Sequence, residues 1–231
     1  MPTSERNPVV LIHGWGGSFR DTWQKPGIDA LLEDIGRRVI GFNLLGHGDR
    51  EKPHDPEAYE NLPNWFLENL PSEEPTVDVV AFSLGALTTL RALISEPGRF
   101  GRVILAGIGD GVFVQSPADS NRRIIDALEG NAPEDDTFAQ TFAHYGTQPG
   151  NDVVALTAIM KRRPSEPVRE EQLSVVPNEV LVVIGDKDFA APAEKLAAAF
   201  PNGRLVVLKN TDHFATTDSF SFIDEILEFL A

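Results

Sequence analysis

Several short segments of the chain are almost continuously apolar and rich in valine, isoleucine and leucine. Their residues do not alternate between apolar and polar, as they would in a strand with one face in water. Such strands are covered on both faces, which is typical of parallel sheets packed between helices. We predict strands at residues 9–12, 39–42, 77–82, 103–105, 180–184 and 205–208.

Apolar residues at helical spacing lie between these segments. The spacing predicts helices at residues 28–35, about 57–69, 83–95, 192–200 and 218–230. The last of them begins at Asp218 or Ser219, either of which can cap its first turn. Strands that alternate with helices predict an α/β fold, with an open, mostly parallel sheet of about six strands and helices on both faces.

About seventy residues between the fourth and fifth predicted strands contain no convincing strand. Helical spacing there predicts three helices, at residues 120–128, 135–145 and 152–162. Residues 163–177 contain three prolines and mixed charge, so we expect an irregular return to the sheet. The chain is therefore predicted to form a core from residues 1–110 and 179–231, with a small helical cap inserted at residues 111–178.

Composition excludes several classes of function. The chain has 20 Lys and Arg against 35 Asp and Glu, and this net charge of −15 would repel nucleic acid and anionic membranes. The absence of cysteine excludes disulfides, thiolate metal sites and a cysteine nucleophile. Residues 1–8 lack the apolar core of a signal peptide, and no stretch approaches a bilayer span. We expect a soluble cytoplasmic protein with a small-molecule substrate; the oligomeric state is left open.

A serine stands where the predicted strand 77–82 runs into the next helix. A turn this tight lifts the Ser83 hydroxyl above the sheet and requires small residues two positions to either side. Ala81 and Gly85 meet that requirement. Serine is also a favoured helix cap, so the pattern alone allows a nucleophile or a cap.

A glycine-rich segment, HGWGGS at residues 13–18, follows the first predicted strand. Backbone N–H groups of such a loop can turn toward a negative oxygen above the strand ends. The segment matches neither the P-loop pattern nor G-x-G-x-x-G, which argues against a nucleotide site.

Acidic residues and a histidine follow the last two predicted strands. Asp186 and Asp188 come after the fifth strand and His213 after the sixth. Parallel strands end at a shared edge where ligands bind, so Ser83, an aspartate and His213 are expected to converge. The two aspartates have the same parity along an extended strand, so alternation does not distinguish them.

The five histidines give no metal-ligand spacing, and H-E-x-x-H is absent. We therefore predict neither a metal nor a cofactor. His13 and His47 are expected to bind loop backbone, and His54 and His144 to be exposed or to lie in the cap.

These motifs resemble those of the α/β-hydrolase family, in its esterase-like branch with a serine nucleophile. The resemblance rests on the His-Gly pair at residues 13–14, the Gly-His-Gly element at residues 46–48, the turn around Ser83, and the order of nucleophile, acid and histidine. It favours Asp188 as the acid, because the family's acid usually lies three residues after the glycine of this strand. Asp110 is a reserve candidate, since some relatives place the acid after the fourth strand.

The resemblance implies a serine hydrolase that cleaves a carboxylic ester through an acyl-enzyme. Ser83 would be the nucleophile, His213 the base, and the N–H groups of Trp15 and Leu84 the oxyanion hole. Aromatic residues under the cap would line the substrate site or simply pack the core. We expect Trp15, Phe113 and Phe142 to bind a small or medium substrate.

Other reactions share this machinery. Thioesters, lactones and carbon–carbon bonds beside a ketone remain open as substrates, as does an acceptor other than water. A protein that keeps the scaffold and binds a ligand without catalysis is the non-enzymatic alternative. The dehalogenase and epoxide hydrolase branches are disfavoured because they attack with an aspartate where this chain has Ser83.

Overall fold

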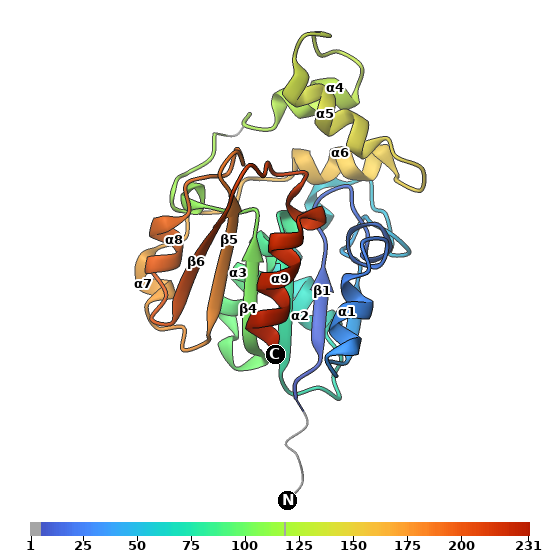
Figure 1. Cartoon of the computed structure of the whole chain (residues 1–231). Coiled ribbons are helices and arrows are strands. Elements are labelled where there is room, and N and C mark those ends of the chain that lie inside the picture. The colour runs from blue at the N-terminus through green and yellow to red at the C-terminus, as the bar shows by residue number, and fades with distance from the viewer. Residues whose placement is uncertain (1–5, 118) are drawn as a thin grey trace, which may run out of the picture.

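A computed structural model describes residues 6–117 and 119–231 and contains a sheet of six parallel strands in the order β2-β1-β3-β4-β5-β6 (Figure 1). The strands are β1 (Val9–Ile12), β2 (Val39–Phe42), β3 (Val77–Phe82), β4 (Phe100–Ala106), β5 (Val180–Gly185) and β6 (Gly203–Leu208). The predicted fold class is confirmed. β4 begins at Phe100, three residues before its predicted start, because Gly101 and Arg102 interrupt the apolar run although the strand continues through them with a register shift against β3.

Each strand supplies side chains to two apolar layers. In β1, Val9 and Leu11 pack on one side of the sheet, and Val10 and Ile12 pack on the other. The first side is covered by α1 (Ile28–Asp34) and α9 (Phe220–Leu230), and α9 lies across the front of the sheet in Figure 1. The second is covered by α2 (Leu62–Asn69), α3 (Leu84–Ser95) and α8 (Glu194–Ala198). Coverage on both faces explains why the strands are apolar at nearly every position.

Prolines lie at the start of both helical elements in the segment 56–69, which differs from its prediction. The helix predicted at residues 57–69 is two elements, a 3-10 turn at Pro56–Tyr59 and then α2. Pro63 lies in the first turn of α2, where its missing N–H removes no helical hydrogen bond. Further short elements are a π-helix at Arg20–Gln24 and 3-10 turns at Pro97–Arg99, Asp110–Phe113 and Thr216–Asp218.

Three helices lie above the carboxyl ends of the strands (Figure 1). They are α4 (Arg122–Leu128), α5 (Thr137–Gly146) and α6 (Val153–Lys161). The segment predicted to be irregular contains a one-turn helix, α7 (Glu170–Leu173), whose first turn is closed by the Gln172 side chain bound to the Arg169 N–H. Residues 1–5 of the predicted core, where the signal-peptide expectation largely falls, and residue 118 of the predicted cap lie outside the described residues.

None of the helices in the described residues has the length and apolar character needed to cross a membrane.

A buried ion pair ties the amino end of the sheet together. Asp78 of β3 accepts a hydrogen bond from the Arg37 guanidinium, and its other oxygen accepts from the Arg102 N–H at 2.8 Å. Arg37 also donates to the main-chain oxygens of Asn7 and Leu230. This pair therefore joins the segment before β1, the start of β2, strands β3 and β4, and the end of α9.

We expect Asp78→Asn to lower the free energy of unfolding by about 3–5 kcal/mol, because it leaves the Arg37 charge buried without a counter-charge. Urea unfolding followed by circular dichroism measures the change. Arg38→Met is the matched control, since the Arg38 side chain is 58% exposed in its pair with Glu74. It should cost less than about 1 kcal/mol. Equal losses in the two variants would contradict the structural role of the buried pair.

Candidate active site

Ser83 occupies a strained turn between β3 and α3. Its backbone has φ 51° and ψ −112°, a region that residues other than glycine seldom adopt. Gly85 makes the turn possible, because a Cβ there would lie 2.5 Å from the carbonyl oxygen of His13. The Ser83 side chain makes no capping hydrogen bond to α3, so the alternative of a simple helix cap does not hold.

The three polar side chains expected to converge form one hydrogen-bonded chain. The Ser83 Oγ lies 2.9 Å from Nε2 of His213, and Nδ1 of His213 lies 3.0 and 2.9 Å from the two carboxylate oxygens of Asp188. His213 and Asp188 are 4% and 5% exposed. Because a carboxylate only accepts hydrogen bonds, it places the imidazole proton on Nδ1 and leaves Nε2 to accept from the Ser83 hydroxyl.

The other two candidate acids bind elsewhere. Asp186 is exposed and accepts a hydrogen bond from the Thr211 N–H at 3.2 Å. Asp110 accepts from the N–H groups at the start of α8, at 2.9 Å from Leu196. Of the three aspartates weighed from the sequence, the structure brings Asp188 to the imidazole.

Aromatic rings surround the His213 imidazole. Ring centroids lie 4.3 Å away for Phe189, 4.9 Å for Phe82 and 5.7 Å for Phe214. Phe189 and Phe214 were missed from the sequence, although each directly follows a candidate residue, Asp188 or His213. Their packing restricts the orientation of the imidazole and keeps water from its faces.

Two main-chain N–H groups beside Ser83 have no protein acceptor within the described residues. They belong to Trp15, in the loop after β1, and to Leu84, the first residue of α3, whose N–H has no partner within the helix. The loop lies directly on the turn, since a Cβ on Gly14 would be 3.1 Å from the Ser83 Cβ. Both groups lie where the strand order reverses between β1 and β3, the usual ligand site in sheets of this kind.

The loop that carries Trp15 is bound on one side by His47 of the core and on the other by residues of the helical layer above the strand ends. From below, Nε2 of His47 accepts from the Gly16 N–H at 3.0 Å. From above, the Asn151 amide donates to the Gly16 oxygen at 2.8 Å, and the Trp15 indole N–H donates to the Leu156 oxygen of α6 at 3.1 Å. Asn151 was missed from the sequence, because an isolated asparagine between two helices gives no signal of its partner.

His13 and His47 are buried neutral groups. Nδ1 of His13 donates to the Gly14 oxygen at 2.7 Å, and its Nε2 accepts from the Leu44 N–H at 3.2 Å. Burial lowers the pKa of His13 to about 4 and lowers the pKa of His47 well below its usual value. As the sequence predicted, both side chains bind loop backbone.

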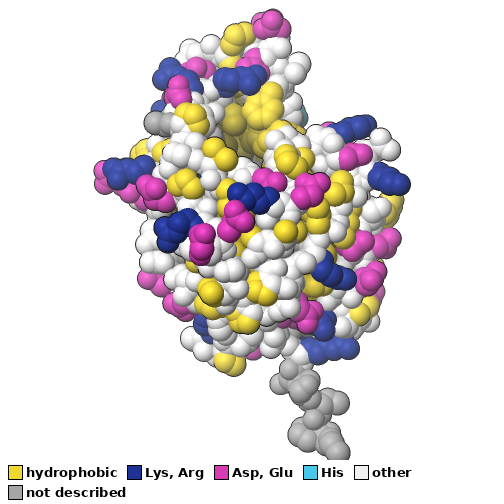
Figure 2. Space-filling model, turned by 90° about the vertical axis from the view of Figure 1, so that its left-hand side faces the viewer, with side chains coloured by type: hydrophobic (Ala, Val, Ile, Leu, Met, Phe, Trp, Pro, Cys, Tyr) yellow, Lys and Arg dark blue, Asp and Glu magenta, His cyan; other side chains and the backbone are white. Residues whose placement is uncertain are grey.

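A cavity of about 620 Å³ opens beside Ser83 and His213, between α3 and the segments 107–114 and 160–168. Figure 2 shows a recess between the topmost part of the molecule and the body below, with hydrophobic side chains on its wall. A much smaller pocket, about 20 Å³, also reaches Ser83 and is lined by Trp15, Phe142 and other aromatic residues.

One aromatic prediction needs correction. Phe113 lines neither the cavity nor the small pocket. Its ring lies 4.5 Å beneath the Lys195 ammonium, because the 3-10 turn that carries it directs it toward α8.

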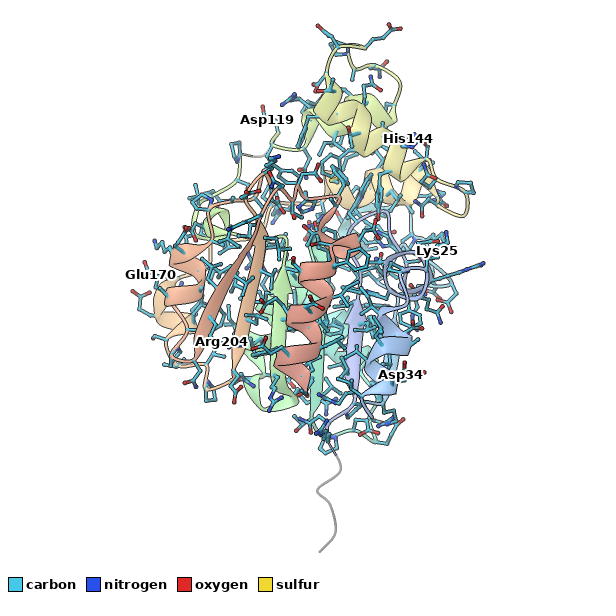
Figure 3. The ribbon with its side chains drawn as sticks, in the orientation of Figure 1. Lys25, Asp34, Asp119, His144, Glu170 and Arg204 are labelled. Atoms are coloured by element: carbon cyan, nitrogen blue, oxygen red, sulfur yellow. The ribbon has the colours of Figure 1, made fainter. Side chains whose placement is uncertain are left out.

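The remaining histidines lie away from Ser83. His54 contacts Asp152 at 3.0 Å, and His144 is exposed on α5 (Figure 3). In residues 6–117 and 119–231, no three His, Asp or Glu side chains are grouped so that they could hold a metal ion.

Comparisons with known proteins concern the family and the fold of this chain. A model of the alpha/beta hydrolase family matches residues 9–222. A haloalkane dehalogenase of Mycolicibacterium paratuberculosis is 33% identical over 107 residues, which are 43% of this chain and 33% of the dehalogenase. The match thus spans about a third of that relative's length.

Two solved structures share the fold along almost the whole chain. The enol-lactonase of Burkholderia xenovorans has a TM-score of 0.75 at 18% identity, covering 100% of this chain and 93% of its own. An esterase from a marine microorganism has a TM-score of 0.68 at 18% identity, covering 97% and 95%. At these identities the likeness concerns the fold alone.

We expect the neutral state of His13 to make the protein lose stability in mild acid. Above about pH 6.5 the imidazole is neutral in both folded and unfolded chains; below it the unfolded chain binds a proton that the folded chain takes up only near pH 4. Between pH 7.5 and 5, His13 should therefore lower the free energy of unfolding by roughly 2 kcal/mol.

Denaturant unfolding at the two pH values measures this loss. His13→Gln keeps a donor and an acceptor but does not titrate, so it should lose about 2 kcal/mol less than the unsubstituted protein. His144→Gln, at an exposed position, is the control and should leave the pH dependence unchanged. The same loss in His13→Gln would show that His13 is not the titrating group.

Proposed function

Because the chain belongs to the alpha/beta hydrolase family, we propose that it is a serine hydrolase that cleaves the carboxylic ester of a small or medium substrate. The observation that carries the proposal is the hydrogen-bonded chain from Asp188 through His213 to Ser83. The 620 Å³ cavity beside it offers room for such a substrate.

In the proposed reaction, the Ser83 oxygen attacks the ester carbonyl carbon while Nε2 of His213 takes the hydroxyl proton. Asp188 holds the imidazole in the tautomer that accepts this proton and stabilises the imidazolium that forms. His213 then gives the proton to the leaving alcohol, and an acyl-enzyme on Ser83 remains. Water, activated by the same imidazole, releases the acid and restores the serine.

The free N–H groups of Trp15 and Leu84 are proposed to stabilise the oxyanion of the tetrahedral intermediates. Charge appears on the carbonyl oxygen only as the serine attacks, so donors fixed in advance stabilise the transition state more than the bound ester. The contacts of Gly16 with His47 and Asn151 would keep the Trp15 group in place.

The residue at the turn favours ester chemistry over dehalogenation. The match to a haloalkane dehalogenase covers only part of the chain. As noted in the sequence analysis, the dehalogenase branch attacks with an aspartate where this chain has Ser83. The esterase and the enol-lactonase among the solved structures act, by their names, on esters or cyclic esters. Thioesters and activated carbon–carbon bonds would pass through the same acyl-enzyme and remain part of the substrate screen.

We expect Ser83→Ala to lower kcat on a p-nitrophenyl ester by roughly 10⁵-fold or more, because no other group replaces the nucleophile. The circular dichroism spectrum should not change. Ser174→Ala, at an exposed serine after α7, is the matched control and should retain full activity. A fluorophosphonate should label the unsubstituted protein and not Ser83→Ala; an unlabelled protein would indicate a ligand-binding member without catalysis.

The acid is tested by a pair of amide substitutions. Asp188→Asn should lower kcat by roughly 10³- to 10⁴-fold, because the amide no longer favours the imidazole tautomer that accepts the serine proton. Asp186→Asn should leave kcat within about twofold, since the exposed Asp186 side chain bonds to the Thr211 N–H and not to His213. If the two variants were impaired equally in steady-state assays, the assignment of Asp188 would be wrong.

A further inference from the structure

We propose that the large cavity beside Ser83 binds a carboxylate of the substrate between Arg91 and Arg162, so that the ester carries a free acid group away from its reacting carbonyl. The substrate class is thus a half-ester of a dicarboxylic acid or a similarly charged ester. The cleavage step rests on the proposed function, whereas the binding of the carboxylate does not.

Arg91 reaches the cavity from the same helix that begins at the proposed nucleophile. Counted from Leu84, the α3 residues Leu87, Thr88 and Arg91 lie three, four and seven positions on, which places all four on one face of the helix. All four line the cavity. With a rise of 1.5 Å per residue, the backbone of Arg91 lies roughly 12 Å along the axis from Ser83. Side chains on a helix lean toward its N-terminus, which brings the guanidinium back toward the serine.

Arg162 reaches the same cavity from the opposite side, directly after α6. Within residues 6–117 and 119–231, neither arginine takes part in an ion pair with a carboxylate. Arg91 donates to the main-chain oxygen of Glu166 at 2.6 Å, and Arg162 donates to that of Ile159 at 2.6 Å. A guanidinium has five N–H donors, so each keeps donors for a ligand.

The positive charges of Arg91 and Arg162 repel each other, and both guanidinium groups are partly shielded from water by burial. Burial, with a smaller contribution from the neighbouring charge of Arg91, lowers the pKa of Arg162 to about 10. Burial also lowers the pKa of Arg91, which the Glu166 carboxylate partly offsets. Both groups remain cationic near neutral pH. A carboxylate between them would relieve the repulsion and form charge-assisted hydrogen bonds with both forks.

The lining of the cavity differs from the rest of the molecule in charge. The chain carries −15 overall, yet its cavity is lined by Arg91, Arg162 and Arg163 against Glu60 and Glu166, both of which are exposed. Apolar residues such as Leu87 and Val168 line the same cavity. A cation pair in a partly apolar cavity, away from Ser83 along α3, suits a carboxylate joined to the ester by an aliphatic spacer.

The alternative is that the two arginines only fasten α3 to the segment 159–166. Under either role, carboxylate binding or fastening, removal of an arginine can lower the stability of the protein. The two roles differ in ligand selectivity, because arginines that only fasten α3 would give no preference for a charged over an uncharged ligand of the same shape.

Binding is tested without turnover in Ser83→Ala, by titration calorimetry with monomethyl suberate and dimethyl suberate. We expect the half-ester to bind more tightly by roughly 10- to 100-fold, and this ratio to approach one when Arg162→Met is added. Arg162→Lys should restore part of the ratio, because it keeps the charge without the planar fork. Arg20→Met, at an exposed arginine outside the cavity lining, is the control and should leave the ratio unchanged.

Turnover by the unsubstituted protein is then compared for p-nitrophenyl hydrogen suberate and p-nitrophenyl methyl suberate, with the shorter succinates as a length series. The suberate half-ester should have the higher kcat/KM, and the succinate should lose this advantage because it does not span the distance to Arg91. Should Arg162→Met fail to fold by circular dichroism, Arg91→Met provides the same comparison of ratios.

The outcomes separate this inference from the proposed function. Half-ester binding that depends on Arg162, without hydrolysis of any ester, would support the carboxylate site and contradict the proposed hydrolase activity. Hydrolysis of charged and uncharged esters with equal kcat/KM, together with equal binding ratios in the arginine variants, would overturn the carboxylate site and leave the hydrolase intact.

Discussion

The strained turn at Ser83 is the constraint on which the rest of the site depends. A residue with positive φ is held there because the surrounding backbone leaves it no alternative: the Ser83 N–H bonds to the Ala106 oxygen at 2.8 Å, and Gly85 brings α3 against the end of β1. Gly14 and Gly107 provide the remaining space, since a Cβ at either would meet Phe82 at about 3 Å or less. The small residues around the turn thus serve one purpose, which is to expose a single hydroxyl at the edge of the sheet.

The same edge contains imidazoles in two contrasting environments. His213 bonds to the Asp188 carboxylate through Nδ1 and to the Ser83 hydroxyl through Nε2. The ring nitrogens of His13 and His47 bond to main-chain groups, and burial lowers the pKa of both. The first can exchange a proton with Ser83 during a reaction, whereas the other two must stay neutral to keep accepting loop N–H groups. Placement beside a carboxylate, and not residue type, therefore separates a proposed base from two structural supports.

The sequence predicts this protein best where the signal is local. The apolar strands, the serine turn and the convergence of Ser83 and His213 follow from patterns of a few residues and from the shared edge of a parallel sheet. Asp186 and Asp188 have the same parity, and only the packed loop shows that Asp188 turns inward. The prediction that Phe113 lines the substrate site was wrong, because the neighbouring residues in the sequence do not indicate which way an aromatic side chain in the cap points.

The residues that the sequence could not reveal belong to contacts between the helical layer and the core. Asn151 and the Leu156 oxygen hold the loop that carries the Trp15 N–H, while Arg162, just beyond α6, lines the cavity. One helix therefore supports both the proposed oxyanion donor and the proposed carboxylate site. A ligand that pairs with Arg162 would therefore contact the residue directly after the helix that binds the Trp15 indole.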